Sequence, residues 1–101
     1  MHQLSLLKSL INNEDITLEQ VNLIEKKSDI LFPDENNSEL FHLIKSYFVK
    51  YNKTPSDNYL STLFQTEKDN KAKVAFKEIK SDPEIEDHKA LCYVIPINYG
   101  T

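Results

Sequence analysis

Arginine is absent from this sequence of 101 residues, and all twelve basic residues are lysines. Arginine is the residue best suited to bidentate contacts with phosphate and guanine, so its absence argues against a reader of nucleic acid. The lysines are also interspersed with acidic residues, as on the solvated face of a helix, and the formal net charge is −4. We therefore expect no direct binding of nucleic acid.

Glycine occurs once, as Gly100. A sheet protein of this size normally needs several glycines for its tight turns and bulges. A phosphate-binding loop or a dinucleotide-binding fold needs glycines in clusters. The scarcity of glycine therefore argues against all of these classes.

Cysteine also occurs once, as Cys92, so neither an intrachain disulfide nor a zinc framework is expected. No apolar run approaches the roughly 20 residues that a membrane-spanning helix requires. The N-terminal residues lack the basic start and apolar stretch of a secretory signal. We predict a cytoplasmic protein without a membrane partner.

Apolar residues make up 40% of the chain and charged residues 28%, which is typical of one ordinary globular domain. The apolar residues recur at helical spacing, first over residues 3–12. A second helix is predicted where Thr17 and Gln20 match a capping box, in which each side chain satisfies a backbone amide.

The third predicted helix is the most apolar and is expected to be central. Its stripe consists of Leu40, Ile44, Tyr47, Phe48 and Tyr51. Thr54 and Pro55 then predict the N-cap and first position of a fourth helix. Two weaker helices follow, over residues 72–79 and 85–95.

These helices predict an all-α protein, with a compact bundle of about four helices followed by a C-terminal helical hairpin. The body would cover about residues 1–66 and the hairpin about residues 68–95, with a tail over residues 96–101. The whole chain would form a single domain.

The residues able to do chemistry are scattered. His2, His42 and His88 lie on separate elements without metal-ligand spacing. Cys92 follows His88 by four residues, but this pair lacks an oxyanion hole and an orienting third group. We therefore predict a non-enzymatic protein with no catalytic residue, no metal and no cofactor. The acidic residues at the start of the last helix compensate its dipole, and they are Asp82, Glu84, Glu86 and Asp87.

Six aromatic residues have helical spacing and leucine neighbours, which predicts core packing rather than stacking on bases. They are Phe41, Tyr47, Phe48, Tyr51, Tyr59 and Phe64.

The two weak helices offer a different candidate site. If they pair only with each other, apolar side chains remain uncovered, and such surface usually marks an oligomer or partner interface. The predicted interface residues are Phe76, Ile79, Ile85, Leu91 and Ile95. The alternative, that both helices fold back onto the body, is equally compatible with the spacing.

Residues 39–56 resemble the N-terminal domain of DnaB-type replicative helicases, and most closely the T-even-like phage type. They contain the pattern F-x-L-I-K-S followed, after a short spacer, by P-S. The leucine-rich residues 6–11, Phe32 and the stretch 82–88 agree with that family in outline. The similarity covers most of residues 4–90 and consists of hydrophobic patterns.

The resemblance implies a helical domain that pairs through its C-terminal hairpin, builds a ring-shaped collar and contacts primase or a helicase loader in DNA replication. In that family the ATPase lies in a separate domain, and this sequence has no phosphate-binding loop. The sequence departs from the family after His88, because Pro96 breaks a helix that normally continues.

Two other functions are compatible with the sequence. The chain is then either a small stand-alone phage protein that binds and modulates a replicative helicase, or an unrelated helical adaptor or structural protein.

Overall fold

The computed structural model describes residues 3–11, 13, 15–66, 68 and 70–81. This part of the chain contains helices and no strands, so the predicted all-α class is confirmed. No helix in the described part is both long and apolar enough to cross a membrane. The helices are α1 (Gln3–Leu10), α2 (Leu18–Lys26), α3 (Ser28–Leu31), α4 (Glu35–Tyr51), α5 (Asp57–Thr66) and α6 (Lys71–Ser81).

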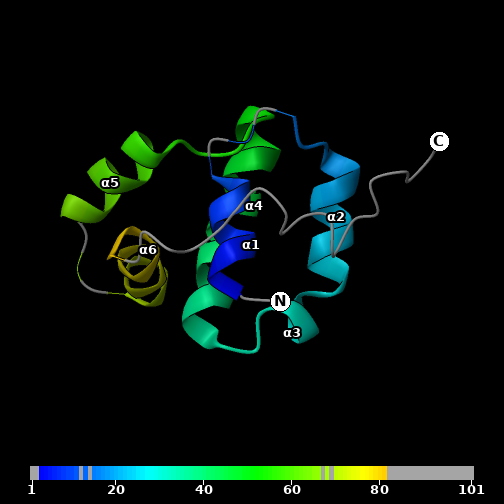
Figure 1. Ribbon diagram of the computed structural model, residues 1–101. Coiled ribbons are helices and arrows are strands. Elements are labelled where there is room, and N and C mark those ends of the chain that lie inside the picture. Colours follow the sequence, from blue (N-terminus) through cyan, green and yellow to red (C-terminus); the bar gives the residue numbers. More distant parts are fainter. Residues whose placement is uncertain (1–2, 12, 14, 67, 69, 82–101) are drawn as a thin grey trace.

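The longest of these helices, α4, is the element on which the others assemble. Its most extensive contacts are with α6, and it also packs against α1 and α2. Figure 1 shows α5 and α6 on one side of the α1–α4 pair and α2 and α3 on the other. The central position predicted for this helix is therefore confirmed.

Local capping fixes both ends of α4. At the N-terminus the Asp34 carboxylate accepts a hydrogen bond from the Asn36 amide at 2.8 Å, so the helix begins before the apolar stripe. At the C-terminus Asn52 adopts the left-handed conformation with φ of 59°, which short polar residues tolerate, and its amide bonds to the Phe48 carbonyl.

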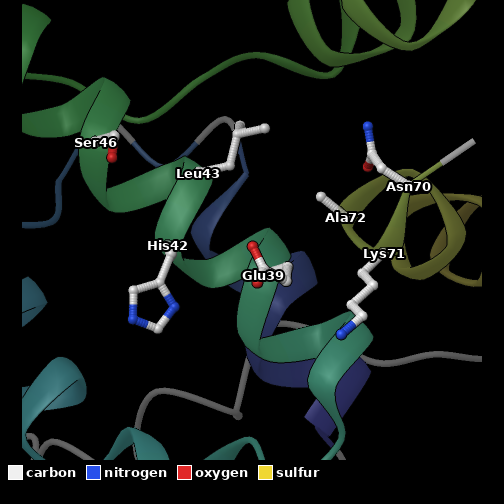
Figure 2. Close-up of a pocket in the computed structure, with 7 residues that line it drawn as sticks. All are labelled: Glu39, His42, Leu43, Ser46, Asn70, Lys71 and Ala72. Carbon is white, nitrogen blue, oxygen red and sulfur yellow. The ribbon is translucent and has the colours of Figure 1, made fainter. Parts of the chain in front are cut away.

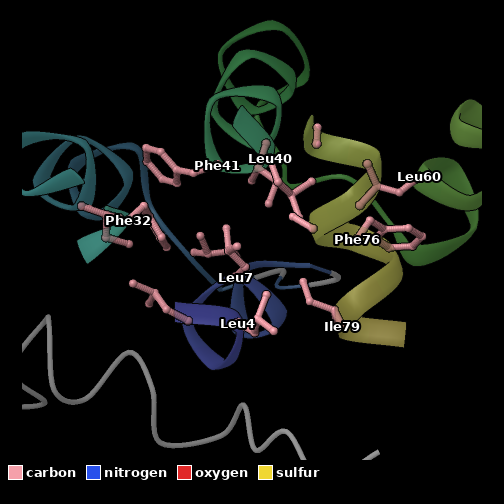
Figure 3. Close-up of a cluster of buried hydrophobic side chains, with 14 of the residues drawn as sticks. Leu4, Leu7, Phe32, Leu40, Phe41, Leu60, Phe76 and Ile79 are labelled. Atoms are coloured by element: carbon pink, nitrogen blue, oxygen red, sulfur yellow. The ribbon is translucent and has the colours of Figure 1, made fainter. Parts of the chain in front are cut away.

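The core lies along the buried face of α4. Leu40, Phe41 and Ile44 are almost completely buried there, beside the leucines of α1. The Phe41 ring stacks on Phe32 with centroids 5.2 Å apart, and Figure 3 shows this pair on one side of Leu7 and the α6 side chains on the other. One continuous hydrophobic cluster therefore joins α1, α4 and α6.

Helix α6 belongs to this core. Ala72, Ala75, Phe76 and Ile79 are all buried, and α6 contacts both α4 and α1. Small side chains such as Ala75 allow two helix backbones to approach closely. Of the two alternatives for this helix, the structure adopts the second, in which it folds back onto the body. The partner predicted for it over residues 85–95 and the tail over residues 96–101 lie outside the described residues.

One predicted cap is wrong. Thr54 does not cap the fourth predicted helix, because α5 begins at Asp57 and the Ser56 hydroxyl accepts from the Tyr59 amide at 3.0 Å. Thr54 instead binds a distant loop through its hydroxyl, and Pro55 is buried beside it. A threonine–proline pair in the sequence looks the same whether it starts a helix or lies in a loop, as it does here.

Candidate interaction surface

The structure describes two of the five predicted interface residues, Phe76 and Ile79. Each is about 5% exposed, and the Phe76 ring lies 5.4 Å from that of Phe64 on α5. Their apolar surface is already covered by the chain itself. Ile85, Leu91 and Ile95 lie outside the described residues.

The residues considered for chemistry do not converge in the described part of the chain. His42 is exposed, and its Nδ1 lies 2.7 Å from the Ser38 carbonyl oxygen one turn earlier. No group of three or more His, Cys, Asp or Glu side chains with metal-binding geometry occurs among the described residues. His2, His88 and Cys92 lie outside them, as do the acidic residues Asp82, Glu84, Glu86 and Asp87.

An open groove of about 500 Å³ runs between α4 and the start of α6. It is lined by Glu39, His42, Leu43, Ser46, Asn70, Lys71 and Ala72. In Figure 2 the imidazole of His42 points away from the residues of α6. The ionisable side chains that line the groove, Glu39, His42 and Lys71, therefore do not all point at one common position, and we assign the groove no chemistry.

A salt bridge closes one end of this region. The Lys71 ammonium donates to the Glu35 carboxylate at 2.5 Å and joins α6 to the first turn of α4. The hydrogen bond and the charge of Lys71 lower the pKa of Glu35, and the same contact raises the pKa of Lys71. Both side chains are largely exposed, so this pair orients the helices more than it stabilises them.

Three tyrosines form a surface cluster where the end of α4 meets α5. The Tyr47 ring centroid lies 4.5 Å from that of Tyr51 and 4.7 Å from that of Tyr59, with interplanar angles of 45° and 55°. Tyr51 is about 50% exposed and Tyr59 about 40%. The cluster is therefore preassembled and accessible at the same time.

A cation borders these rings. The Lys50 ammonium lies 5.3 Å from the Tyr51 ring centroid, which is the range of a cation–π contact. Lys53 follows two residues after Tyr51 and is exposed. At the start of α5, the Asp57 carboxylate accepts a hydrogen bond from the Lys80 ammonium at 2.8 Å. This contact joins α5 to the end of α6.

The prediction that all six aromatic residues pack in the core is right for the phenylalanines and wrong for Tyr51 and Tyr59, while Tyr47 is half-buried. Phe41, Phe48 and Phe64 are buried, whereas Tyr51 and Tyr59 are exposed. Tyrosine and phenylalanine differ here because the phenol of tyrosine has an apolar ring and also a polar hydroxyl, which needs a partner or water. Periodicity alone treats both residues as apolar.

These features define an all-helical domain whose accessible tyrosine cluster suits contacts with another protein, since tyrosine is enriched at interfaces. No protein-family model, curated protein or solved structure matches the chain.

Proposed function

We propose that this chain is a non-catalytic assembly domain of the type found at the N-terminus of replicative helicases. It self-associates and docks primase or a helicase loader during DNA replication. Its place of action is the cytoplasm, or the host cytoplasm if a phage encodes it. It needs no cofactor and contacts protein rather than nucleic acid or membrane.

One observation supports an interaction domain most directly, namely the surface cluster in which exposed Tyr51 and Tyr59 pack against half-buried Tyr47. Tyrosine rings offer large contact area, while a phenol has only two side-chain torsions to restrict on binding. The rings already contact each other, so a partner meets a surface that is largely ordered in advance.

The surface proposed for docking differs from the one that the hydrophobic pattern favours. Phe76 and Ile79 are buried in the core, and Phe76 contacts Phe64 of α5, so in this proposal Phe76 helps to hold α5 and its tyrosine in place. Docking then uses the outer surface of α4 and α5.

The test is binding of the purified chain to a replicative helicase, its primase and its loader, each immobilised in turn. We expect saturable binding to at least one, and loss of binding by at least about tenfold when Tyr51 and Tyr59 are both changed to Ala, since two aromatic interface residues are removed. Val74→Ala is the matched control, because Val74 is exposed on α6. A chain that binds none of the three and also remains a monomer contradicts the proposal.

A further inference from the structure

Two loops that are distant in sequence are joined at one end of the bundle. The Asn13 amide donates to the Thr54 hydroxyl at 3.1 Å, and the same hydroxyl donates to the Asn13 carbonyl at 3.0 Å. Thr54 is buried and Asn13 is half-buried, so this contact is partly shielded from water. Figure 1 shows the start of α2 and the end of α4 at this same upper end of the molecule.

The two joined segments carry opposite charge. Residues 9–25 contain four carboxylates and no lysine, whereas residues 40–56 contain three lysines and no carboxylate. Lys45 and Glu25 are used internally, since they form an ion pair between α4 and α2. Asp15 and Glu19 therefore give this end of the domain an acidic half, and Lys50 and Lys53 give it a basic half.

Each half also exposes apolar surface. In the acidic half Leu18 is about 48% exposed, between Asp15 and Glu19, which are exposed too. In the basic half Tyr51 and Tyr59 are accessible beside the lysines at positions 50 and 53. The two halves thus complement each other both in charge and in apolar character.

Local hydrogen bonds hold the acidic half in one conformation. The Asn13 side-chain oxygen accepts from the Asp15 amide at 3.0 Å and from the Ile16 amide at 3.1 Å. Thr17 and Gln20 then form both bonds of the capping box at the start of α2. A surface fixed in this way loses little conformational freedom on binding.

From this arrangement we propose that the end face is the contact surface of a two-fold dimer of this chain. Leu18 with Asp15 and Glu19 of one copy meets the tyrosines with Lys50 and Lys53 of the other, and the two-fold axis repeats the contact in reverse. Surfaces that carry both complementary halves side by side are self-complementary about such an axis. This inference rests on the proposed function and specifies the self-association within it. Because the dimer covers Tyr51 and Tyr59, self-association and the docking of primase or a loader use the same surface and exclude one another.

The charges make the dimer sensitive to salt. Exposed ion pairs weaken as the screening length falls from about 10 Å at 0.1 M salt to about 3 Å at 1 M. The charges also fix the orientation of the two copies, because a rotated arrangement brings like charges together. The dissociation constant of the dimer is therefore expected to rise steadily with sodium chloride concentration.

A charge-exchange experiment tests this surface. One variant carries Lys50→Glu and Lys53→Glu, and the other carries Asp15→Lys and Glu19→Lys. Sedimentation equilibrium should show the native chain as a reversible dimer and each variant with a dissociation constant at least about tenfold higher, because like charges then face each other. An equimolar mixture of the two variants should restore dimerisation, since each acidic surface again meets a basic one.

The control variant carries Lys26→Glu and Lys27→Glu, two exposed lysines at the end of α2. It changes the net charge by the same amount as the first variant and should leave the dimer intact. Circular dichroism of every variant confirms that the helices are retained, so a loss of dimer is not a loss of fold.

Each outcome separates this inference from the proposed function. A native dimer that is indifferent to both exchanges, or a mixture that stays monomeric, overturns the end-face contact and leaves self-assembly in place. A monomer at every concentration that still binds primase or loader overturns the dimer alone. A monomer that binds none of the replication proteins overturns both.

Discussion

The ring of Tyr47 on α4 lies 4.7 Å from the ring of Tyr59 on α5, at an interplanar angle of 55°. The two residues come from different helices, so this contact joins α5 to α4. Since both helices contribute exposed tyrosines to the proposed docking surface, the pair also sets the shape of that surface.

This proximity predicts an oxidative cross-link between α4 and α5. When a one-electron photo-oxidant takes an electron from each phenol and each loses its proton, the two phenoxyl radicals couple through their ring carbons to give dityrosine. Mass spectrometry after trypsin should find the peptide containing Tyr47 joined to the one containing Tyr59, with the loss of two hydrogens. Tyr59→Phe should abolish this link while leaving a Tyr47–Tyr51 link available. Its absence in the native chain contradicts the described placement of α5.

The Thr54 hydroxyl should make a measurable contribution to stability. Thr54→Val keeps the shape of the side chain but leaves the Asn13 amide and carbonyl without this partner. We expect the free energy of unfolding to fall by about 1–3 kcal/mol, the usual effect of leaving polar groups unpaired away from water, and by an amount near the lower figure because the contact is only partly buried. Urea denaturation followed by circular dichroism measures this change. Thr54→Ser retains the hydroxyl and should lose less; equal losses would show that packing, not hydrogen bonding, is responsible.

Burial of α6 predicts a large penalty for truncating its aromatic residue. Phe76→Ala removes most of a buried side chain and should lower the free energy of unfolding by about 3–5 kcal/mol. Ile79→Val removes one buried methyl group and should cost about 0.5–1.5 kcal/mol, which a small domain tolerates. Exposed Val74 on the same helix is the matched position, where Val74→Ala should stay within about 0.5 kcal/mol. Similar small effects at all three positions would show that α6 does not belong to the core.

The pair formed by Glu35 and Lys71 predicts a specific dependence on pH. Because Lys71 lowers the pKa of Glu35, the pair stabilises the fold above the ordinary carboxyl range and loses this effect as pH falls through the lowered value. Because Glu35 raises the pKa of Lys71, the effect is also lost as pH rises through that raised value. Carboxyl resonances followed by NMR should show a titration midpoint for Glu35 below the usual one.

Lys71→Ala should move that midpoint back upward. Added salt should have the same effect, since both groups are exposed to solvent. A midpoint that is unchanged by the substitution contradicts the salt bridge.

The sequence allowed prediction of features whose determinants are local. The capping box of Thr17 and Gln20 was predictable because both partners lie within one helical turn, and both hydrogen bonds occur. The buried positions Leu40, Ile44 and Phe48 of the α4 stripe were predictable for the same reason. Capping by Thr54 was predicted wrongly, because its actual partner, Asn13, is 41 residues away.

The candidate site was harder to predict because it depends on how helices are placed. The narrow apolar face of α6 indicated a helix with surface left to bury, but its burial depends on the surface that α1 and α4 present to it. The tyrosine cluster likewise requires α5 to lie beside the end of α4, which hydrophobic spacing does not specify. The residue type was the one indication of this surface, since tyrosine favours positions where its ring is partly buried and its hydroxyl reaches water.

The packing of α6 on α4 has a consequence for synthesis of the chain. Leu40 and Ile44 emerge from the ribosome well before Phe76 and Ile79, which help to enclose the same core. At translation rates of about 5–20 residues per second, the part of α4 that α6 covers stays exposed for a few seconds. During this interval the nascent chain presents a hydrophobic helix to chaperones and to neighbouring nascent chains.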